Sequence, residues 1–438
     1  MEGLTGQHAQ PVIGGWCFAN LTVTAIDLGD IQASAFTQDH ATATDDGELS
    51  FVFQSTSAVT VQTYIGGTYA SDIIAQFPEL TGTFTDSNTG ATISNVYRDL
   101  TAIKSLMTYD GVTYELADDL NPNLFVTEDP TTHDTLTPTI PTKGSPSSVQ
   151  ITDWTKWTSL TLGNVGSNYE NSNINDNFLS YCTGLTSLTF LPSNWKPTTT
   201  GEDALYSLEG LTSLSLSSAW NITTIGDGFL AKCKVTSVII PKTWKVETIG
   251  GSFLWRSSVQ TLDMSTQTEL TSIGSGFLES STVQTINFPS TWKVTHIGYQ
   301  FLRCAGSLTS ITFPEYNGPS NQKITIENAF MPQTYSIQQL AIPYSWNVEK
   351  IDAEFLVGCQ NLTQLDMGNV LASQMTLDEY DEQKEQWTSC SLLADNNTVA
   401  SYTTGITISG KDKHNIVEQY PDIADAQHND YRHLIEAD

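Results

Sequence analysis

Between Leu185 and Met367 the chain repeats one short phrase eight times, an apolar residue followed by two polar residues, an apolar residue, any residue and an apolar residue. A second phrase separates the copies and is clearest at 244–254 (WKVETIGGSFL) and 292–302 (WKVTHIGYQFL). Within it, Phe229, Phe253, Phe277 and Phe301 recur every 24 residues. A fixed period of this length predicts a solenoid of stacked coils, here called rungs. The eight copies read LTSLTF, LTSLSL, VTSVII, VQTLDM, VQTINF, LTSITF, IQQLAI and LTQLDM.

The alternation within each phrase predicts which side chains are buried. The apolar positions should point into the solenoid, and the intervening Thr, Ser and Gln should point out. One rung cannot bury its own apolar side, but stacked rungs form a continuous core. Each buried Leu, Ile or Val contributes about 1.5–3 kcal/mol. The fold class predicted from the residues is therefore a repeat solenoid, mostly β. The tryptophans at 195, 220, 244, 292 and 346 are expected to pack on its flank rather than to form a ligand platform.

Two short residue patterns recur at the same positions of successive repeats, and both are similar to those of a known family. They are clearest where Ile225-Gly226-Asp-Gly-Phe229-Leu230-Ala-Lys-Cys233 precedes Val235-Thr-Ser-Val238-Ile-Ile240-Pro241. This pattern resembles the BspA-like class of bacterial leucine-rich repeats, strongly over 150–370 and weakly over 12–36. The tryptophan slot departs from the commonest pattern of that class. The resemblance implies a leucine-rich repeat solenoid in a surface-displayed adhesin or binding scaffold.

The interruption of the repeat predicts four parts. Residues 1–36 contain partial repeats, since Val23-Thr-Ala-Ile26-Asp-Leu28 matches the first phrase. Residues 37–150 are expected to form an inserted β-rich domain that ends in a Pro/Thr linker, serving recognition, docking or oligomerisation. Residues 151–370 form the leucine-rich repeat solenoid, and 371–438 an acidic C-terminal cap or an attachment to a partner.

Several elements are expected outside the repeats. Asp110-Gly111 between alternating residues predicts a hairpin with a two-residue turn. Apolar residues at helical spacing predict a helix within 91–107, and the Pro/Thr-rich stretch 130–146 reads as a semi-rigid linker. After the repeats, 377–387 is expected to be an acidic helix and 406–408 a final strand.

Charge and cysteine usage exclude several classes. With 48 acidic against 18 basic residues, the net charge is −30, which opposes binding to nucleic acid or anionic membranes. No apolar run approaches the roughly 18 residues that a membrane span needs. Four cysteines near the Phe slot never fall on adjacent rungs, so their Cα atoms should lie about 10 Å apart, beyond the roughly 7 Å limit of a disulfide. Free thiols are therefore expected, and Cys17 and Cys390 are left undecided. The four are Cys182, Cys233, Cys304 and Cys359.

The beginning of the chain bears on its location. Met1-Glu2-Gly3-Leu4 has neither the basic nor the apolar region of a secretory signal peptide. The Thr-, Ser- and Asn-rich composition nevertheless resembles that of an extracellular protein. Either a signal was removed, or the protein reaches the outside on a particle such as a virion. We favour the second reading slightly and expect an extracellular or virion-surface location.

A search for chemistry gives no catalytic, cofactor or metal site. The metalloprotease, P-loop and nucleophile-elbow patterns are not present. Residues 86–90 (DSNTG) faintly resemble a calcium loop but lack the full ligand set, so a plain turn is the better reading. His428 and His433 are five residues apart and miss a common helical face. We therefore expect no enzyme activity.

The remaining functional surface is the outward row of the predicted strands, a flat ladder of hydroxyls and amides with almost no charge and no aromatic residues. It could bind protein or carbohydrate through many weak hydrogen bonds, although the missing aromatics argue against sugar stacking. The alternative is that the face binds nothing, and that Thr and Gln are present because they stack well and keep the face soluble. The interaction face is predicted at Thr186, Thr212, Thr236, Gln260, Gln284, Thr309, Gln338 and Thr363.

Three functions remain in competition. The first is a non-enzymatic recognition or adhesion protein that binds a host or cell-surface protein or glycan through the repeats or the insert. The second is a structural component of a virion (fibre, tail or capsid-decorating protein) or of a surface layer, in which the repeats are a rigid spacer and contact other particle proteins or further copies of the chain. The third, a polysaccharide-active enzyme with its catalytic residues in the insert, is the weakest.

Overall fold

The described residues fall into two compact units. Unit 1 comprises 1–105, 162–164 and 191–193, and unit 2 comprises 106–161, 165–190 and 194–438. The computed structural model describes residues 25–27, 32–35, 63–66, 72–73, 83–85, 92–94, 97–99, 105–129, 131–132, 134–191, 193–352, 355–356, 358–375, 380–381, 386–387, 406–419, 422–425 and 430–437.

Unit 1 contains a small parallel sheet in the order β1 (Ala25–Asp27), β2 (Thr63–Gly66) and β5 (Tyr97–Asp99). Strands β3 (Thr83–Thr85) and β4 (Thr92–Ser94) form an antiparallel pair. A short 3₁₀ helix, η1, spans Ala33–Ala35. The partial repeat predicted at 23–28 thus contains a parallel strand, although its place in the repeat array stays a prediction.

The helix predicted within 91–107 is wrong. Residues 92–94 and 97–99 are strands, and another strand begins at Leu106. The helical spacing of Val96, Leu100 and Ile103 misled the interpretation, because the window also contains Thr92 and Ile93. β-branched residues are stiff at χ1 and favour strands, and pairing within a sheet overrides a short helical pattern.

Unit 2 begins with a four-stranded sheet in the order β11-β10-β6-β7. The hairpin predicted at Asp110-Gly111 is confirmed, with positive φ values of 48° and 77° at the two turn residues. Part of the stretch expected to be a linker instead forms a second hairpin, β8–β9. The domain boundaries at 36, 150 and 370 remain predictions. The strands are β6 (Leu106–Tyr109), β7 (Val112–Glu115), β8 (Thr139–Pro141), β9 (Ser148–Gln150), β10 (Trp157–Leu162) and β11 (Ser187–Phe190), and the 3₁₀ helices are η4 (Pro122–Leu124), η5 (Trp154–Lys156) and η6 (Ser167–Tyr169).

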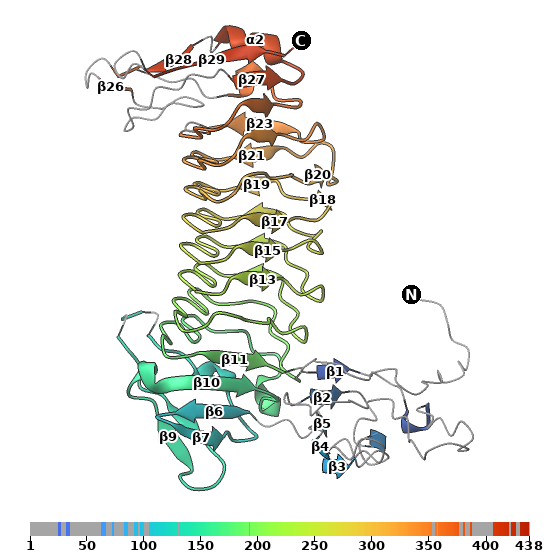
Figure 1. The fold of residues 1–438 in the computed structure, drawn as a ribbon, viewed down its shortest axis with the longest axis vertical. Coiled ribbons are helices and arrows are strands. Elements are labelled where there is room, and N and C mark those ends of the chain that lie inside the picture. The colour runs from blue at the N-terminus through green and yellow to red at the C-terminus, as the bar shows by residue number, and fades with distance from the viewer. Residues whose placement is uncertain are drawn as a thin grey trace. The chain divides into compact units, whose positions relative to one another are not determined.

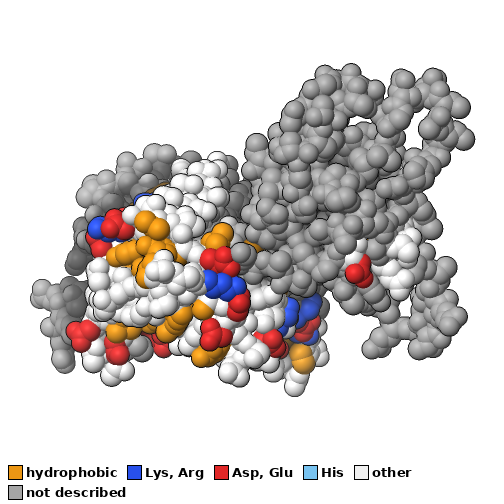
Figure 2. Space-filling model, turned by 90° about the horizontal axis from the view of Figure 1, so that it is seen from below, with side chains coloured by type: hydrophobic (Ala, Val, Ile, Leu, Met, Phe, Trp, Pro, Cys, Tyr) orange, Lys and Arg blue, Asp and Glu red, His pale blue; other side chains and the backbone are white. Residues whose placement is uncertain are grey.

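The surface at this end of unit 2 is mixed in character. Figure 2 shows small clusters in which Lys or Arg side chains lie next to Asp or Glu. Uncharged surface and hydrophobic side chains lie between these clusters. The Lys143 Nζ lies 3.2 Å from Glu115 Oε1, and the Lys156 Nζ lies 3.3 Å from Asp110 Oδ2. Solvent screens such exposed pairs, so they add little to the stability of this end.

The solenoid prediction is confirmed, since unit 2 continues as a stack of mostly β rungs (Figure 1). One side of the stack is a six-stranded parallel sheet in the order β12-β14-β16-β19-β21-β23. Each rung adds one strand in register, so Ile225, Ile249, Ile273 and Ile297 line up into the core. These strands are β12 (Thr224–Ile225), β14 (Thr248–Ile249), β16 (Ser272–Ile273), β19 (His296–Ile297), β21 (Ile324–Ile326) and β23 (Val348–Ile351), and β18 (Thr291–Trp292) pairs with β20 (Glu315–Tyr316) between the sheets.

The eight-fold phrase forms the opposite side of the stack, here called the strand face. It contains the parallel sheet β13-β15-β17 and a second sheet, β22-β24-β27-β29-β28, that closes the C-terminal end. Only β28 runs antiparallel to its neighbour. The strands are β13 (Ser237–Ile239), β15 (Thr261–Asp263), β17 (Thr285–Asn287), β22 (Gln339–Ala341), β24 (Gln364–Asp366), β27 (Ile406–Ser409), β28 (Asp422–Asp425) and β29 (Asp430–Glu436).

A column of phenylalanine rings runs through the core. Its members stack with centroid separations of 6.2, 5.4, 5.1, 5.1 and 5.1 Å along the column. Every ring is fully buried. The period seen in the sequence is therefore the spacing of one aromatic layer per rung. The column consists of Phe229, Phe253, Phe277, Phe301, Phe330 and Phe355.

The five tryptophans are packing residues as predicted, but they lie in the core rather than on the flank, with at most 2% of each residue exposed. The Trp244 Nε1–H donates to the Ser217 carbonyl at 2.9 Å, and Trp346 donates to Pro314 at the same distance. One rung uses a buried glutamine instead. The Gln267 Nε2–H donates to the Pro241 carbonyl at 3.1 Å, and its Oε1 accepts from a backbone N–H at 3.2 Å. The side-chain amide of Gln267 thus donates a hydrogen bond to a backbone carbonyl, as the indole N–H of tryptophan does on other rungs.

The chain passes four of the core phenylalanines, Phe229, Phe253, Phe277 and Phe301, in an unusual backbone conformation. Around Phe253, residues Ser252, Leu254 and Arg256 have φ values of 54°, 56° and 51°. The N–H groups of Ser252 and Arg256 donate to the following rung, at 2.6 and 2.8 Å, whereas Leu254 donates back to Phe229 at 3.1 Å. A left-handed conformation costs non-glycine residues about 1–3 kcal/mol, and these inter-rung bonds offset that cost.

The C-terminal end differs from the helical cap expected over 377–387. Strands β25 (Tyr380–Asp381) and β26 (Gln386–Trp387) pair antiparallel, so the helix prediction is wrong there. Carboxylates that recur three and four residues apart repel one another on a helix. The strand predicted at 406–408 is confirmed as β27. Helix α2 (Lys413–Gln419) follows it and buries Ile416, and η7 (Ala372–Gln374) precedes this end.

The four cysteines of the described rungs are unbonded thiols. Cys182, Cys233 and Cys359 are buried, and Cys304 is partly buried. Burial raises the pKa of Cys233 to about 12 and also raises that of Cys182. These thiols are packing residues. Among the described residues, moreover, no helix is long and apolar enough to cross a membrane.

Candidate interaction surface

The structure places the eight predicted interface residues at the start of each strand-face segment. All eight side chains are exposed. The backbone N–H of Gln260 donates to Thr236, and that of Gln284 donates to Gln260, both at 2.8 Å. Further along, the N–H of Thr363 donates to Gln338 at 2.9 Å. Within these stretches the outward side chains therefore follow one another at the separation of neighbouring strands, about 4.8 Å.

The row is not one continuous ladder. The rungs at 212–216 and 309–313 form no strand, although they carry the same phrase as the others. Consequently β11 does not pair with β13, and β17 does not pair with β22. Thr212 and Thr309 lie on these two interruptions. The structure thus brings Thr236 close to Gln260 and Gln284, but separates this group from the rest of the row.

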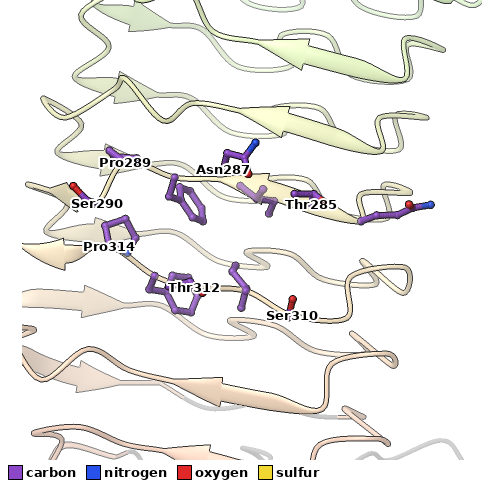
Figure 3. Close-up of a pocket in the computed structure, with 12 residues that line it drawn as sticks. Thr285, Asn287, Pro289, Ser290, Ser310, Thr312 and Pro314 are labelled. Atoms are coloured by element: carbon purple, nitrogen blue, oxygen red, sulfur yellow. The ribbon is translucent and has the colours of Figure 1, made fainter.

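A hollow of about 370 Å³ lies at the second interruption (Figure 3). Figure 3 shows Thr285 and Asn287 on one rung and Ser310 and Thr312 on the next. The lining contains no charged residue, in a chain of net charge −30. We call this hollow the strand-face groove, and it is lined by Gln284, Thr285, Ile286, Asn287, Phe288, Pro289, Ser290, Ser310, Ile311, Thr312, Phe313 and Pro314.

The groove opens because core positions are incompletely covered. On the regular rungs Val238 and Leu262 are 1% and 0% exposed, whereas the equivalent Ile286 and Ile311 are partly exposed. Phe288 is also partly exposed and packs edge-on against Trp292 at 5.3 Å. The outward row itself contains no aromatic residue, but Phe288, at the last apolar position of its phrase, adds a partly exposed ring beside it. The longer 29-residue step from Phe301 to the next core phenylalanine was the available signal.

Comparison with known proteins agrees with this architecture. The description "BspA type leucine rich repeat region" matches residues 148–260 and 198–325, with six copies. Residues 148–325 of the solenoid are BspA-type leucine-rich repeats. No curated protein matches the sequence. The two matches together span residues 148–325, so they cover the regular part of the solenoid and fewer than half of the 438 residues.

Two solved structures are similar to the chain. The pneumococcal vaccine antigen PcpA has 14% sequence identity, with coverage of 70% of this chain and 88% of PcpA and a TM-score of 0.29. A leucine-rich repeat protein from Bacteroides ovatus has 15% identity, with coverage of 60% of this chain and 93% of that protein and a TM-score of 0.20.

A second surface of the BspA-type array lies beside the phenylalanine column, here called the aromatic edge. Tyr181 and Tyr206 meet edge-to-face at 5.2 Å. The Lys232 Nζ lies 5.1 Å from the ring centroids of both Tyr206 and Trp255, and the Arg256 guanidinium lies 4.6 Å from that of Trp255. Cation–π pairs at exposed sites contribute about 0.5–1 kcal/mol each. The cations therefore cover the rings and stabilise the edge.

A third surface is a hollow of about 560 Å³ with an acidic rim. The Asp176 and Asp227 Oδ1 atoms accept N–H groups of the following rung at 2.8 and 2.7 Å. Nearby, burial and, to a smaller extent, repulsion from Glu202 raise the pKa of Asp203 to about 6. Among the described residues no group of three or more His, Cys, Asp or Glu could hold a metal ion. These carboxylates bond to the backbone and form no cation site.

Proposed function

We propose that this protein is a non-enzymatic recognition protein, displayed on the surface of a cell or a virion, that binds a protein or glycan through the strand face of its BspA-type array. The observation that carries this proposal is the exposed, uncharged outward row, which meets an uncharged groove on the same face. The match of residues 148–325 to BspA-type leucine-rich repeats also supports it.

The strand face suits recognition for two physical reasons. Its side chains are fixed at strand spacing on a rigid stack, so little conformational entropy is lost on binding. Its hydroxyl and amide groups both donate and accept hydrogen bonds, whereas the net charge of −30 disfavours anionic partners by long-range repulsion. Hot spots of binding usually lie in desolvated pockets, and the groove supplies one.

The proposal is tested with the full-length chain on arrays of extracellular proteins and glycans, read by biolayer interferometry. The double variant Q260K/Q284K adds two long charged side chains to the regular part of the strand face. The control N221K/S275K adds the same charge at two exposed positions elsewhere on the stack. Loss of a captured partner in the first variant alone supports strand-face recognition. Equal loss in both variants, or no captured partner, counts against it.

A structural component of a virion or surface layer is the second candidate. The continuous phenylalanine column and the six-stranded sheet favour it, because a stack closed by these contacts is a stiff spacer. Light scattering of the full-length chain, with and without millimolar calcium, separates the two. A stable closed oligomer supports the spacer function, and a monomer supports recognition by single molecules.

A further inference from the structure

We infer that the strand-face groove is a binding site for a neutral sugar unit of a glycan. This inference rests on the proposed recognition function and assigns the chemical class of its ligand. The juxtaposition that carries it is a partly exposed aromatic ring, an apolar floor and unpaired backbone groups within one uncharged hollow.

The backbone at the groove has unused hydrogen-bonding groups. Across the described rungs from 284 to 342, no backbone hydrogen bond joins residues 309–313 to β17 or to β22. The regular ladder resumes at Glu315, whose N–H donates to Ser290 at 3.0 Å. Backbone polar groups without a protein partner need water or a ligand. The hydroxyl groups of a sugar both donate and accept, so they fit an edge that presents both N–H and C=O groups.

The floor and rim of the groove match the two faces of a sugar ring. Ile286, Ile311 and Phe288 offer partly exposed apolar surface, on which the C–H face of a hexose can pack. Thr285 and Ser310 on the two rungs supply hydroxyl partners at the rim. A volume of about 370 Å³ lies at the lower end of the range of ligand pockets, about 300–1,000 Å³. That volume suits one or two sugar units.

The charge around the groove selects a neutral ligand. None of the lining residues is charged, so a carboxylate, sulfate or phosphate would find no cation to pair with. Asp263 lies directly beside Asn287 in the β15–β17 register, and its carboxylate would repel an anionic sugar. An acidic glycan is therefore disfavoured both by the lining and by the neighbouring rung.

The groove is also too narrow for an extended peptide. Insertion of a strand between two rungs would need about twice the normal strand separation of 4.7–4.9 Å. The same two rungs are hydrogen-bonded to each other at β18–β20 and at β19–β21. These contacts hold the rungs together, so the hollow accepts a compact ring rather than a third strand.

The test uses the full-length chain and soluble probes detected by saturation-transfer NMR, with titrations for affinity. The neutral probes are maltohexaose, cellohexaose and mannohexaose, the anionic probe is hexagalacturonate, and the peptide probe is an uncharged Thr-Ile repeat. We expect a dissociation constant on the order of a millimolar for at least one neutral hexasaccharide, because the site is shallow.

Matched variants locate the site. Ser310→Trp fills the groove and should weaken binding at least tenfold, whereas Ser237→Trp places the same side chain at the equivalent exposed position of a regular rung and should leave it unchanged. Phe288→Leu should weaken binding severalfold, and Phe190→Leu, at the same slot of another rung, should not. If S310W melts at a lower temperature than the wild type, Thr312→Val replaces it as a shape-conserving loss of one rim hydroxyl.

Each outcome has a defined meaning. Neutral binding that is lost in S310W and kept in S237W supports the sugar site. No binding of any neutral probe, equal binding by S310W and the wild type, tighter binding of hexagalacturonate, or binding of the peptide alone overturns it. If the arrays reveal a protein partner that Q260K/Q284K abolishes while no neutral sugar binds, the recognition function stands and only the sugar inference falls.

Discussion

Asp203 gives the most direct test of the electrostatics of the stack. Burial is the largest cause that raises the pKa of this carboxyl group to about 6; the neighbouring carboxylates contribute to the rise, and Lys232 opposes it. In an unfolded chain the same group titrates near a pKa of about 3.9. The folded state therefore binds a proton that the unfolded state has already lost, over the window from about pH 4 to about pH 6.

The sign of the effect follows from linkage. Stability rises with pH only where the unfolded state binds more protons, and here the folded state binds more. The contribution of Asp203 is thus favourable below pH 4 and is lost as the pH rises through 6. A difference of about two pKa units corresponds to a ceiling of about 3 kcal/mol. Because the side chain is partly exposed, solvent screening reduces this to about 1 kcal/mol.

The variant Asp203→Asn removes the titrating group and keeps the backbone, since asparagine tolerates the left-handed conformation that Asp203 adopts at φ 52°. We expect D203N to be about 1 kcal/mol more stable than the wild type at pH 7.5. We also expect its stability to vary less between about pH 4.5 and 6.5.

Urea unfolding followed by tryptophan fluorescence measures both quantities, because the core tryptophans are buried. The urea midpoints of two proteins are compared only where the denaturant dependence of the unfolding free energy (the m-value) is equal. This condition is needed because repeat arrays can lose cooperativity. The control E247Q removes one negative charge from an exposed site of a nearby rung. A D203N protein that is less stable at pH 7.5, or that retains the wild-type pH dependence, refutes the reasoning.

Three further predictions concern the core. Phe277→Ala should lower the free energy of unfolding by about 3–5 kcal/mol, because the ring is fully buried between two stacked neighbours; a loss below 1 kcal/mol in urea titrations would contradict this. Gln267→Ala should cost about 1–3 kcal/mol through unpaired backbone groups, whereas the exposed Thr268→Ala should cost almost nothing in the same assay. Cys233, whose pKa is raised to about 12, should resist iodoacetamide at pH 8 until urea is added, and mass spectrometry of its peptide measures this.

The regular part of the fold could be predicted from the sequence because its rule is local and repeats. Each rung buries the same slots, so Phe229, Phe253 and Phe277 reveal both the period and the core. The hairpin at Asp110-Gly111 was equally readable, since only a few residue types accept positive φ at both turn positions. These features depend on neighbouring residues or on adjacent copies of one pattern.

The groove could not be predicted in the same way. The interrupted rung reads LTSITF at 308–313, and the paired rung reads VQTINF at 283–288, so the phrase itself does not reveal which one forms a strand. The irregular rung coincides with the longer step of 29 residues from Phe301 to Phe330. The outward row was predicted as one ladder for the same reason. The helix predictions at 91–107 and 377–387 failed because a short window can satisfy helical spacing while strand pairing decides.

The two interruptions of the strand face affect the mechanics of the rod. The sheet β12–β23 continues through every rung from 224 to 351, whereas the opposite sheets are cut at 212–216 and at 309–313. A stack with one continuous sheet and one interrupted sheet bends most easily at the interruption. An applied force would therefore narrow or widen the groove, while the continuous sheet keeps its length. A ligand that contacts both sides of the groove would stiffen the stack at this point.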